Sequence, residues 1–159
     1  MSNTTSDTQA KGRVQVGDIA PNFTLPSQTG EAVTLHDLRG KNVLLYFYPK
    51  DNTTGCTAQA CAFRDQYEIF TDAGAEVIGV SSDSTESHQQ FAAQYRLPFT
   101  LLSDMGGTIR KRYGATTMGV LPGRVTYVID KNGVVRHMFS SAFNAKQHIT
   151  EAVQALQAL

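Results

Sequence analysis

Apolar residues along the chain form two kinds of pattern: short continuous runs, and stripes in which every third or fourth residue is apolar. The segment "NVLLYFYP", residues 42–49, is an apolar and aromatic run that is too short for an ordinary helix. A run of this kind is typical of a strand that is buried on both faces of a sheet. The segment "EVIGVSS", residues 76–82, has the same character. We therefore expect two central strands, the first of which ends at Pro49.

A helical stripe lies between these two strands. Its apolar residues recur at intervals of three and four: Ala60, Phe63, Tyr67 and Phe70. This spacing predicts a helix from Cys56 to about Asp72, which Gly74 ends. Three more helices are expected, over residues 84–95, 107–114 and 144–156. Ser84 or Thr85 is placed to cap the first of these, and Asn144 to cap the last.

Two hairpins and a short strand complete the pattern. The segment "NFTLPSQTGEAVTL" has two short alternating runs around residues 27–31, with Gly30 in the turn. The segment "RVTYVIDKNGVVRHMF", residues 124–139, has two β-rich runs joined by a turn at residues 130–133. Between them, "FTLL" at residues 99–102 predicts a short strand, and a long loop follows residue 114.

The alternation of strands and helices predicts an α/β domain. Helical crossovers cover both faces of a central sheet, and the late hairpin adds antiparallel strands to it. Residues 1–13 are rich in Ser, Thr and Asn without apolar periodicity, so we expect a disordered tail there and one domain over residues 14–159.

Composition and charge exclude several classes of function. The 159 residues contain 14 basic and 14 acidic side chains, so no global field favours nucleic acid or an anionic membrane surface. The N-terminus has no apolar core of a secretory signal, and no stretch is long and apolar enough to span a membrane. We therefore expect a soluble, cytoplasmic protein with a small-molecule substrate.

The two cysteines are the strongest chemical signal. Cys56 follows a loop and begins the helix predicted over residues 56–72, where free N–H groups and the helix dipole favour a thiolate. Cys61 lies five residues further on, so in an intact helix the two Cα atoms are about 8.6 Å apart. A disulfide needs Cα atoms within about 7 Å. The pair can bridge only if the first turns of the helix unwind.

Position alone leaves two other interpretations of the cysteines open. Cysteine is among the most often buried residues, so both could be simple core residues. A zinc site is less well supported, because structural zinc needs four ligands at paired short spacings. The histidines are instead scattered singly along the chain and are expected to be surface or cap residues: His36, His88, His137 and His148. We expect no metal ion and no cofactor.

The stretch "YPKDNTTGCTAQAC" resembles the peroxiredoxin signature Pro-x-x-x-Thr-x-x-Cys, here Pro49, Thr53 and Cys56. The spacing Cys-Thr-x-x-x-Cys is similar to that of the peroxiredoxin Q, or bacterioferritin comigratory protein, subfamily. Further segments resemble the family in the same order: "GDIAPNFTLPSQTG", "VIGVSSDS" and "GRVTYVID", which contains Arg124. The resemblance covers nearly all of the chain after the tail and implies a thioredoxin-like fold, with a central mixed sheet flanked by helices and an N-terminal hairpin.

The resemblance also implies the chemistry. Cys56 would be the peroxidatic cysteine, which attacks a hydroperoxide and becomes a sulfenic acid. Cys61 would resolve it as an intramolecular disulfide, which a thioredoxin or a similar dithiol reductant reduces. Thr53 would hold the thiolate and the incoming peroxide, Arg124 would supply a fixed cationic fork nearby, and Pro49 would cover the site from water. We expect hydrogen peroxide and organic hydroperoxides as substrates and a monomeric enzyme.

Two residues depart from the subfamily pattern: Thr54 and, to a smaller degree, Val125, where a hydroxyl residue is common. Thr54 stands where the subfamily usually has Pro, which frees φ and restores a backbone donor before Cys56.

Two rival functions remain open. A thioredoxin-like disulfide oxidoreductase is one rival, although such proteins usually carry Cys-x-x-Cys after Trp and this chain has no Trp. The second rival is a redox sensor that binds a partner when the helix over residues 56–72 opens.

Overall fold

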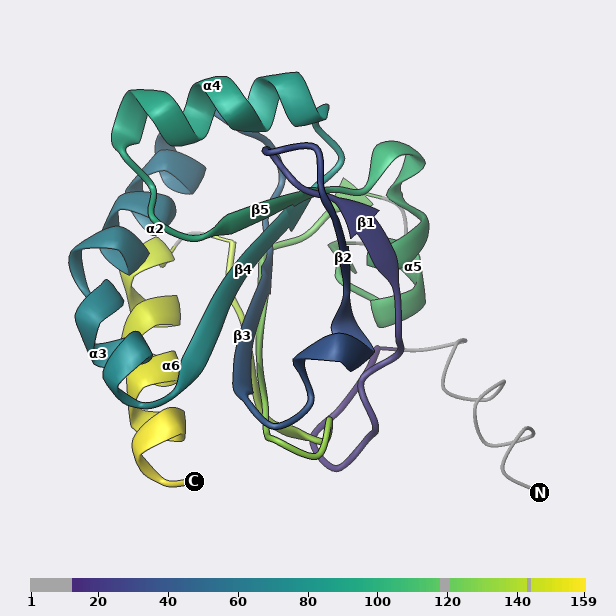
Figure 1. Ribbon diagram of the computed structural model, residues 1–159, viewed down its shortest axis with the longest axis vertical. Coiled ribbons are helices and arrows are strands. Elements are labelled where there is room, and N and C mark those ends of the chain that lie inside the picture. The colour runs from purple at the N-terminus through teal and green to yellow at the C-terminus, as the bar shows by residue number, and fades with distance from the viewer. Residues whose placement is uncertain (1–12, 118–120, 143) are drawn as a thin grey trace.

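The computed structural model describes residues 13–117, 121–142 and 144–159. A mixed sheet of five strands forms its centre, with the strand order β5-β4-β3-β8-β9 (Figure 1). The strands are β3 Asn42–Phe47, β4 Ala75–Ser81, β5 Thr100–Ser103, β8 Val125–Ile129 and β9 Val135–Ser140. The first three run parallel, and β8 and β9 are antiparallel to their neighbours. The predicted α/β fold with a central mixed sheet is confirmed.

Strand β3 is the central strand, and its sequence explains why. All six of its residues are buried. Leu44 belongs to the apolar cluster on one face of the sheet, whereas Val43 and Leu45 belong to the cluster on the other. Side chains of successive strand residues point to opposite faces, so an uninterrupted apolar run fits only a strand that is covered on both sides.

Helices cover both faces of the sheet. One face packs against α2 Thr54–Asp65, α3 Tyr67–Asp72, α4 Thr85–Tyr95 and α6 Ala145–Gln157. The other face packs against α5 Thr108–Tyr113 and the segment around Val14. In Figure 1, α2, α3 and α6 lie together at one side of the sheet, and α4 runs across the end near β5.

Helix α4 is capped as predicted, whereas the cap predicted for α6 is not formed. Ser84 Oγ accepts a hydrogen bond from Ser87 N at 3.1 Å. Asn144 stands at the N-cap position of α6, but within the described part of the chain its side chain makes no cap hydrogen bond.

The helix predicted over residues 56–72 is two helices. Helix α2 begins at Thr54, two residues earlier than predicted, and Gln66 separates it from α3. The stripe of apolar residues continues through this break because spacings of three and four report which side chains face the core. They do not report whether every backbone hydrogen bond of the helix is made, so one non-helical residue leaves the stripe in place.

Two small hairpins flank the sheet. The predicted N-terminal hairpin is present, with β1 Thr24–Pro26 antiparallel to β2 Ala32–Thr34 and Gly30 in its turn at a φ of 90°. Strands β6 Thr116–Thr117 and β7 Leu121–Pro122 pair within the segment predicted to be a long loop. Two-residue strands are too short to produce a detectable alternation.

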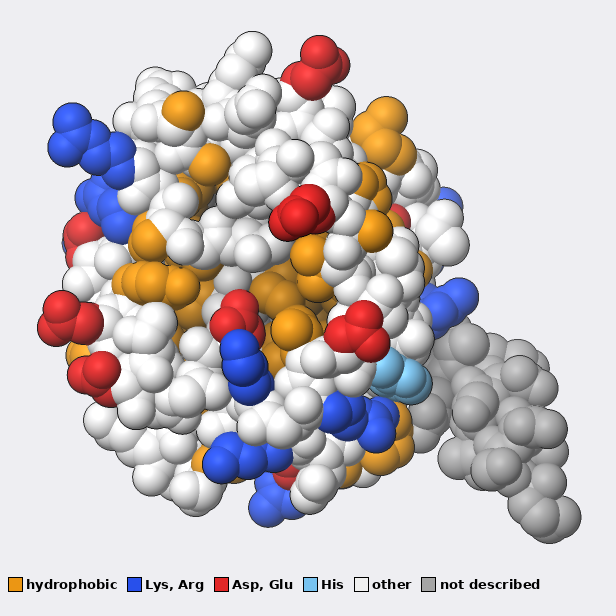
Figure 2. Space-filling view, in the orientation of Figure 1, with side chains coloured by type: hydrophobic (Ala, Val, Ile, Leu, Met, Phe, Trp, Pro, Cys, Tyr) orange, Lys and Arg blue, Asp and Glu red, His pale blue; other side chains and the backbone are white. Residues whose placement is uncertain are grey.

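The predicted disordered tail, residues 1–13, lies outside the described residues except for Arg13. Arg13 Nε donates to Gly114 O at 2.9 Å and its Nη2 to Thr116 O at 3.0 Å. None of the helices in the described ranges is long and apolar enough to cross a membrane. On the face shown in Figure 2, both acidic and basic side chains are present.

Candidate active site

Cys56 is the third residue of α2 and lies where the chain passes from the end of β3 into that helix. The first backbone bond of the helix runs from Thr57 N to Thr53 O at 2.8 Å, so the N–H groups of residues 54–56 have no carbonyl of an earlier turn to bind. Cys56 is 1% exposed. Its sulfur therefore lies at the positive end of the helix dipole and is shielded from bulk water.

Pairing of the strands brings Arg124 to the same place. Strand β8 is antiparallel to β3, and Val125 at the start of β8 is paired with Phe47 at the end of β3. Arg124 directly precedes β8, so it lies beside the loop over residues 48–53 that leads to Cys56. The two residues are 68 positions apart in the sequence and meet only through this register.

The guanidinium of Arg124 is held as a fork over Cys56. Its Nη2 lies 3.4 Å from Cys56 Sγ, its Nη1 donates to Gln59 Oε1 at 2.6 Å, and its Nε donates to Ala142 O at 3.4 Å. Arg124 is 7% exposed. A planar group with three directed bonds offers a fixed donor and a positive charge to the sulfur and to any group that approaches it.

Two residues of this arrangement were not predicted from the sequence. Gln59 is fully buried, and in the described structure its Nε2 has no hydrogen-bond partner. The available signal was a polar residue three positions after Cys56, on the apolar side of the helix. Gly55 is the second, because a Cβ atom at that position would lie 2.9 Å from Arg124 Nη2. Its lack of a side chain lets the guanidinium approach the helix.

Thr53 and Pro49 lie in the loop, and their predicted roles stay predictions. Thr53 is exposed at the N-cap position of α2, and its hydroxyl donates to Lys50 O at 3.0 Å. In the described part of the molecule, this side chain makes no cap bond to the helix. Pro49 is half-buried at the bend that follows β3. Pairing between strands thus brings the Arg124 guanidinium to the Cys56 sulfur, whereas the Thr53 hydroxyl is bound to Lys50 O.

Both cysteines are free thiols, and α2 is intact across them. Cys56 is buried and Cys61 is half-buried. An unbroken helix keeps their Cα atoms about 8.6 Å apart, which is too far for a disulfide. The structure is therefore the reduced, helical state of the pair.

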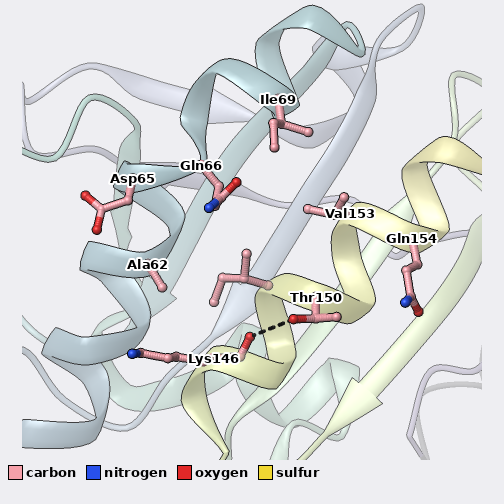
Figure 3. Close-up of a pocket in the computed structure, with 9 residues that line it drawn as sticks. Ala62, Asp65, Gln66, Ile69, Lys146, Thr150, Val153 and Gln154 are labelled. Carbon is pink, nitrogen blue, oxygen red and sulfur yellow. Dashed lines mark hydrogen bonds between the residues drawn. The ribbon is translucent and has the colours of Figure 1, made fainter.

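A groove runs along the side of α2 that faces α6 (Figure 3). It has a volume of about 540 Å³, and in Figure 3 Ala62 and Val153 point into it from opposite sides. A second hollow of about 350 Å³ lies at the starts of the two helices, and Lys146 lines both spaces. Ala58 and Ala62, on either side of Cys61 in α2, therefore border open space.

A second buried arginine lies near the site. Arg110 Nη2 donates to Tyr48 O at 2.8 Å, and its Nη1 donates to Gly123 O at 3.2 Å. Burial lowers the pKa of Arg110, while the charges of Asp104 and Cys56 raise it. Arg110 thus joins the end of β3 to the residue before Arg124 and adds positive charge within range of the sulfur.

Two histidines predicted to be surface or cap residues are buried instead. His88 and His148 are both 0% exposed. His148 Nε2 donates to Ser141 O at 2.9 Å, and its Nδ1 accepts from Thr126 Oγ1 at 2.8 Å. Both nitrogens have partners in the neutral ring, so the fold satisfies a polar side chain that a single-sequence pattern cannot place inside. The Ser141 that His148 holds is next to Ala142, which binds Arg124.

The buried state of His148 predicts a loss of stability in acid. Burial lowers the pKa of His148 to about 4. An unfolded histidine titrates near 6.5, so between about pH 6.5 and 4 the unfolded chain binds a proton that the folded chain does not. The free energy of unfolding should fall by about 3 kcal/mol over this window, as measured by urea unfolding at several pH values.

Two variants separate this contribution from other acid effects. His148→Gln has no titrating ring, so its pH dependence should be flatter than that of the parent by the same amount. His36→Gln, at an exposed position, should keep the parent's slope. Equal slopes in the parent and His148→Gln would contradict the prediction.

One cluster has the composition of a metal site. Ligand atoms of Asp51, Asp83 and His88 lie within 4.8 Å of one another. Hydrogen bonds already engage these atoms: Asp51 Oδ2 with Ser87 and His88, and Asp83 Oδ2 with Ser81 Oγ and Asp51 N. A cation would have to displace these bonds, so we assign the cluster to the structure of the loop.

Thr54 is the first residue of α2. It stands where the peroxiredoxin Q subfamily usually has Pro. This is the helical position that tolerates Pro best, because its N–H is unpaired anyway. Thr54→Pro should therefore leave the reduced helix intact and restrict the unwound state, which stabilises the helix by about 0.4–1 kcal/mol. We expect disulfide formation to slow about two- to fivefold, measured by rapid acid quench and mass spectrometry. Faster formation would show that the ring strains the helix start.

Comparisons with known proteins agree with this geometry. The model of the AhpC/TSA family matches residues 16–138, and the chain belongs to that family. Peroxiredoxin Q, chloroplastic, of Oryza sativa subsp. japonica is 55% identical over 150 residues, which are 93% of this chain and 69% of the rice protein. The protein of the same name from Sedum lineare is 54% identical over 149 residues, 92% of this chain and 80% of the relative.

Solved structures show the same relationship. Peroxidoxin BcpB of Mycobacterium tuberculosis superposes with a TM-score of 0.85 at 36% identity, covering 92% of this chain and 99% of that chain. Peroxiredoxin Q of Xanthomonas campestris gives a TM-score of 0.82 at 28% identity, covering 93% and 98%. The expected resemblance and the thioredoxin-like fold are confirmed. The chain is an enzyme of the peroxiredoxin class, a thiol peroxidase that needs a peroxide and a reductant.

The predicted cytoplasmic location is contradicted by these comparisons. The relatives from rice and Sedum lineare are named as chloroplastic proteins. The prediction was based on the lack of an apolar secretory core, and that observation speaks only against the secretory route. The lack of a secretory core does not distinguish the cytoplasm from a plastid.

Proposed function

We propose that Cys56 reduces hydroperoxides by a two-cysteine mechanism. The Cys56 thiolate attacks the terminal peroxide oxygen, so that an S–O bond forms, the O–O bond breaks, and the leaving oxygen takes a proton to become water or an alcohol. The sulfur is oxidised to a sulfenic acid. Cys61 then attacks this sulfur, the S–O bond breaks, and water leaves as the disulfide forms.

The contact between Arg124 Nη2 and Cys56 Sγ, at 3.4 Å, is the observation that carries the proposal. A thiol that was only a core residue would not need a buried guanidinium held at its sulfur by Gln59 and Ala142. The fork can stabilise the thiolate before the reaction and the charge on the breaking O–O bond during it. In the proposed mechanism, the Thr53 hydroxyl turns to the bound peroxide and Pro49 shields it from water.

The proposed substrates are hydrogen peroxide and organic hydroperoxides. A solved structure of the bacterioferritin comigratory protein of Xanthomonas campestris is described in terms of its alkyl peroxide reduction activity. That protein is 28% identical to this chain with a TM-score of 0.82. We propose that a monomer carries out the cycle, since both cysteines lie in one helix, and that thioredoxin reduces the disulfide.

Turnover distinguishes the proposed enzyme from a redox sensor. We expect continuous consumption of hydrogen peroxide in the presence of thioredoxin, thioredoxin reductase and NADPH, measured by loss of NADPH absorbance. Oxidation of one equivalent followed by no further consumption would favour the sensor. Reduction of disulfide substrates without consumption of peroxide would favour a disulfide oxidoreductase.

A further inference from the structure

A buried network of hydrogen bonds holds the loop over residues 48–53 that leads to Cys56. The carboxylate of Asp51 accepts hydrogen bonds from Tyr48 Oη at 2.6 Å, from Ser87 Oγ at 2.8 Å and from His88 Nδ1 at 2.7 Å. Asp51 is 5% exposed and His88 is 0% exposed. A buried carboxylate with three donors is held far more firmly than a surface side chain.

Both ring nitrogens of His88 have a partner in this network. His88 Nε2 lies 2.9 Å from Leu102 O, and a carbonyl only accepts, so this nitrogen carries a proton. The other nitrogen, Nδ1, lies 2.7 Å from Asp51 Oδ2. Burial raises the pKa of Asp51, but hydrogen bonds from His88, Tyr48 and Ser87 outweigh burial and lower it overall. His88 therefore links the Asp51 carboxylate to the backbone of Leu102 in β5.

The network joins the loop to helix α4 and strand β5. Ser87 and His88 belong to α4, and Leu102 belongs to β5. The backbone of the loop is held as well, because Asp51 N donates to Asp83 Oδ2 at 2.8 Å. Asp51 is thus fixed through both its side chain and its backbone to parts of the fold that carry neither cysteine.

The chain becomes exposed to solvent immediately after Asp51. Asn52, Thr53 and Thr54 are exposed, and Asn52 has a φ of 64°, a left-handed conformation that reverses the chain. Among the described side-chain bonds of this stretch, the Thr53 hydroxyl reaches back only to Lys50 O. Asp51 is therefore the last anchored residue before the helix that must unwind.

We propose that Asp51 and His88 are positioning residues for Cys56. The pair marks the N-terminal limit of the unwinding that disulfide formation requires. Residues up to Asp51 stay in place in both redox states, and the chain beyond them moves. After reduction, the fixed end brings Cys56 back to Arg124, so the site forms again in the same geometry. This inference rests on the proposed two-cysteine cycle.

Hydrogen exchange of the unaltered protein tests the limit directly. In the reduced and in the oxidised protein, the Asp51 amide should stay protected, because its bond to Asp83 persists. The amides of residues 57–61 should lose protection on oxidation. Loss of protection at Asp51 together with these amides would overturn the proposal. Failure of the wild-type protein to form the disulfide with peroxide would instead contradict the proposed function.

Two substitutions at Asp51 test the effect on the reaction. Asp51→Asn keeps an acceptor for Tyr48 and can donate to the neutral ring of His88, so it preserves the anchor without the charge. Asp51→Ala removes both contacts. We expect the rate constant for oxidation of Cys56 by hydrogen peroxide to fall about tenfold or more in Asp51→Ala and to stay within about threefold in Asp51→Asn.

Rescue by the Asn variant distinguishes positioning from general stability. Lys41→Ala, which removes an exposed ion pair with Glu76, serves as the control and should react like the parent. Equal rates in the parent and Asp51→Ala would overturn the proposal, as would an equal loss in Asp51→Asn and Asp51→Ala. Should Asp51→Ala not fold, the hydrogen exchange of the unaltered protein still decides.

Discussion

Cys56→Ser should abolish peroxide reduction, and Cys61→Ser should leave a single turnover. A serine hydroxyl at residue 56 is not ionised near neutral pH and is not oxidised by a peroxide, so no fixed cation nearby can restore the reaction. Cys61 lies about 8.6 Å away along the helix and is absent from the described hydrogen bonds of the Cys56 sulfur. Its removal leaves the first step intact and takes away only the group that resolves the sulfenic acid.

The measurement is the amount of peroxide consumed per protein in a rapid-quench experiment. We expect no consumption above background for Cys56→Ser and a burst of one equivalent for Cys61→Ser, without further turnover through thioredoxin. A small thiol added to Cys61→Ser should restore slow turnover by attacking the sulfenic acid. Equal and mild effects of the two substitutions would show that the roles are assigned wrongly.

The sequence predicted those parts of the fold whose pattern depends only on which face is buried. The run over residues 42–49 is apolar throughout, and β3 is buried on both faces. The turn at Gly30 and the hairpin of β8 and β9 also follow from local chemistry. The break at Gln66 was not predictable, since it changes the hydrogen bonds of the helix and leaves the buried face unchanged.

Only part of the candidate active site was predictable from local sequence, because some of its residues meet only through tertiary contacts. Cys56 follows from local position at a helix start. Arg124 came only from the family resemblance, because its approach depends on the pairing of Val125 with Phe47. Gln59 was missed, since a polar residue is stable in a core only when the fold brings it a partner.

The buried histidines were missed on the same grounds. His88 and His148 were assigned to the surface, yet each has a partner for both ring nitrogens: Asp51 and Leu102, and Thr126 and Ser141. These partners come from other strands, loops and helices. No spacing within one segment reports them, so such networks become visible only when the tertiary structure is known.

The contacts around the cysteines divide the molecule into a fixed part and a movable part. Arg124, Gln59 and Gly55 form a site only while α2 is helical, because two of the three lie in that helix. Unwinding α2 to join the cysteines therefore removes Gln59 from Arg124 and takes the site apart. In the proposed cycle, the oxidised enzyme therefore reacts with a second peroxide only after reduction lets the helix form again.

Arg124→Ala should slow the reaction with peroxide by about 100-fold, far more than a change in thiolate fraction explains. For thiols in general, a fall in pKa from about 8.5 to about 6 raises the thiolate fraction at pH 7 about thirtyfold. The weaker nucleophile loses roughly tenfold of this gain. Stabilisation of charge on the breaking O–O bond, at about 3 kcal/mol for one well-placed donor, is the larger effect, and in the proposed mechanism the Arg124 fork supplies it.

Two rates measured on the same variants separate these contributions. Alkylation by iodoacetamide across pH reports the thiolate fraction, and rapid mixing with hydrogen peroxide reports the full reaction. Arg124→Lys should recover only part of the loss, because an ammonium cannot bind Gln59 and the sulfur as a planar fork. Arg136→Ala, which removes a guanidinium with a 55% exposed side chain, is the control and should react like the parent. A loss in Arg124→Ala that the alkylation data account for completely would mean that Arg124 acts on the ground-state thiolate alone.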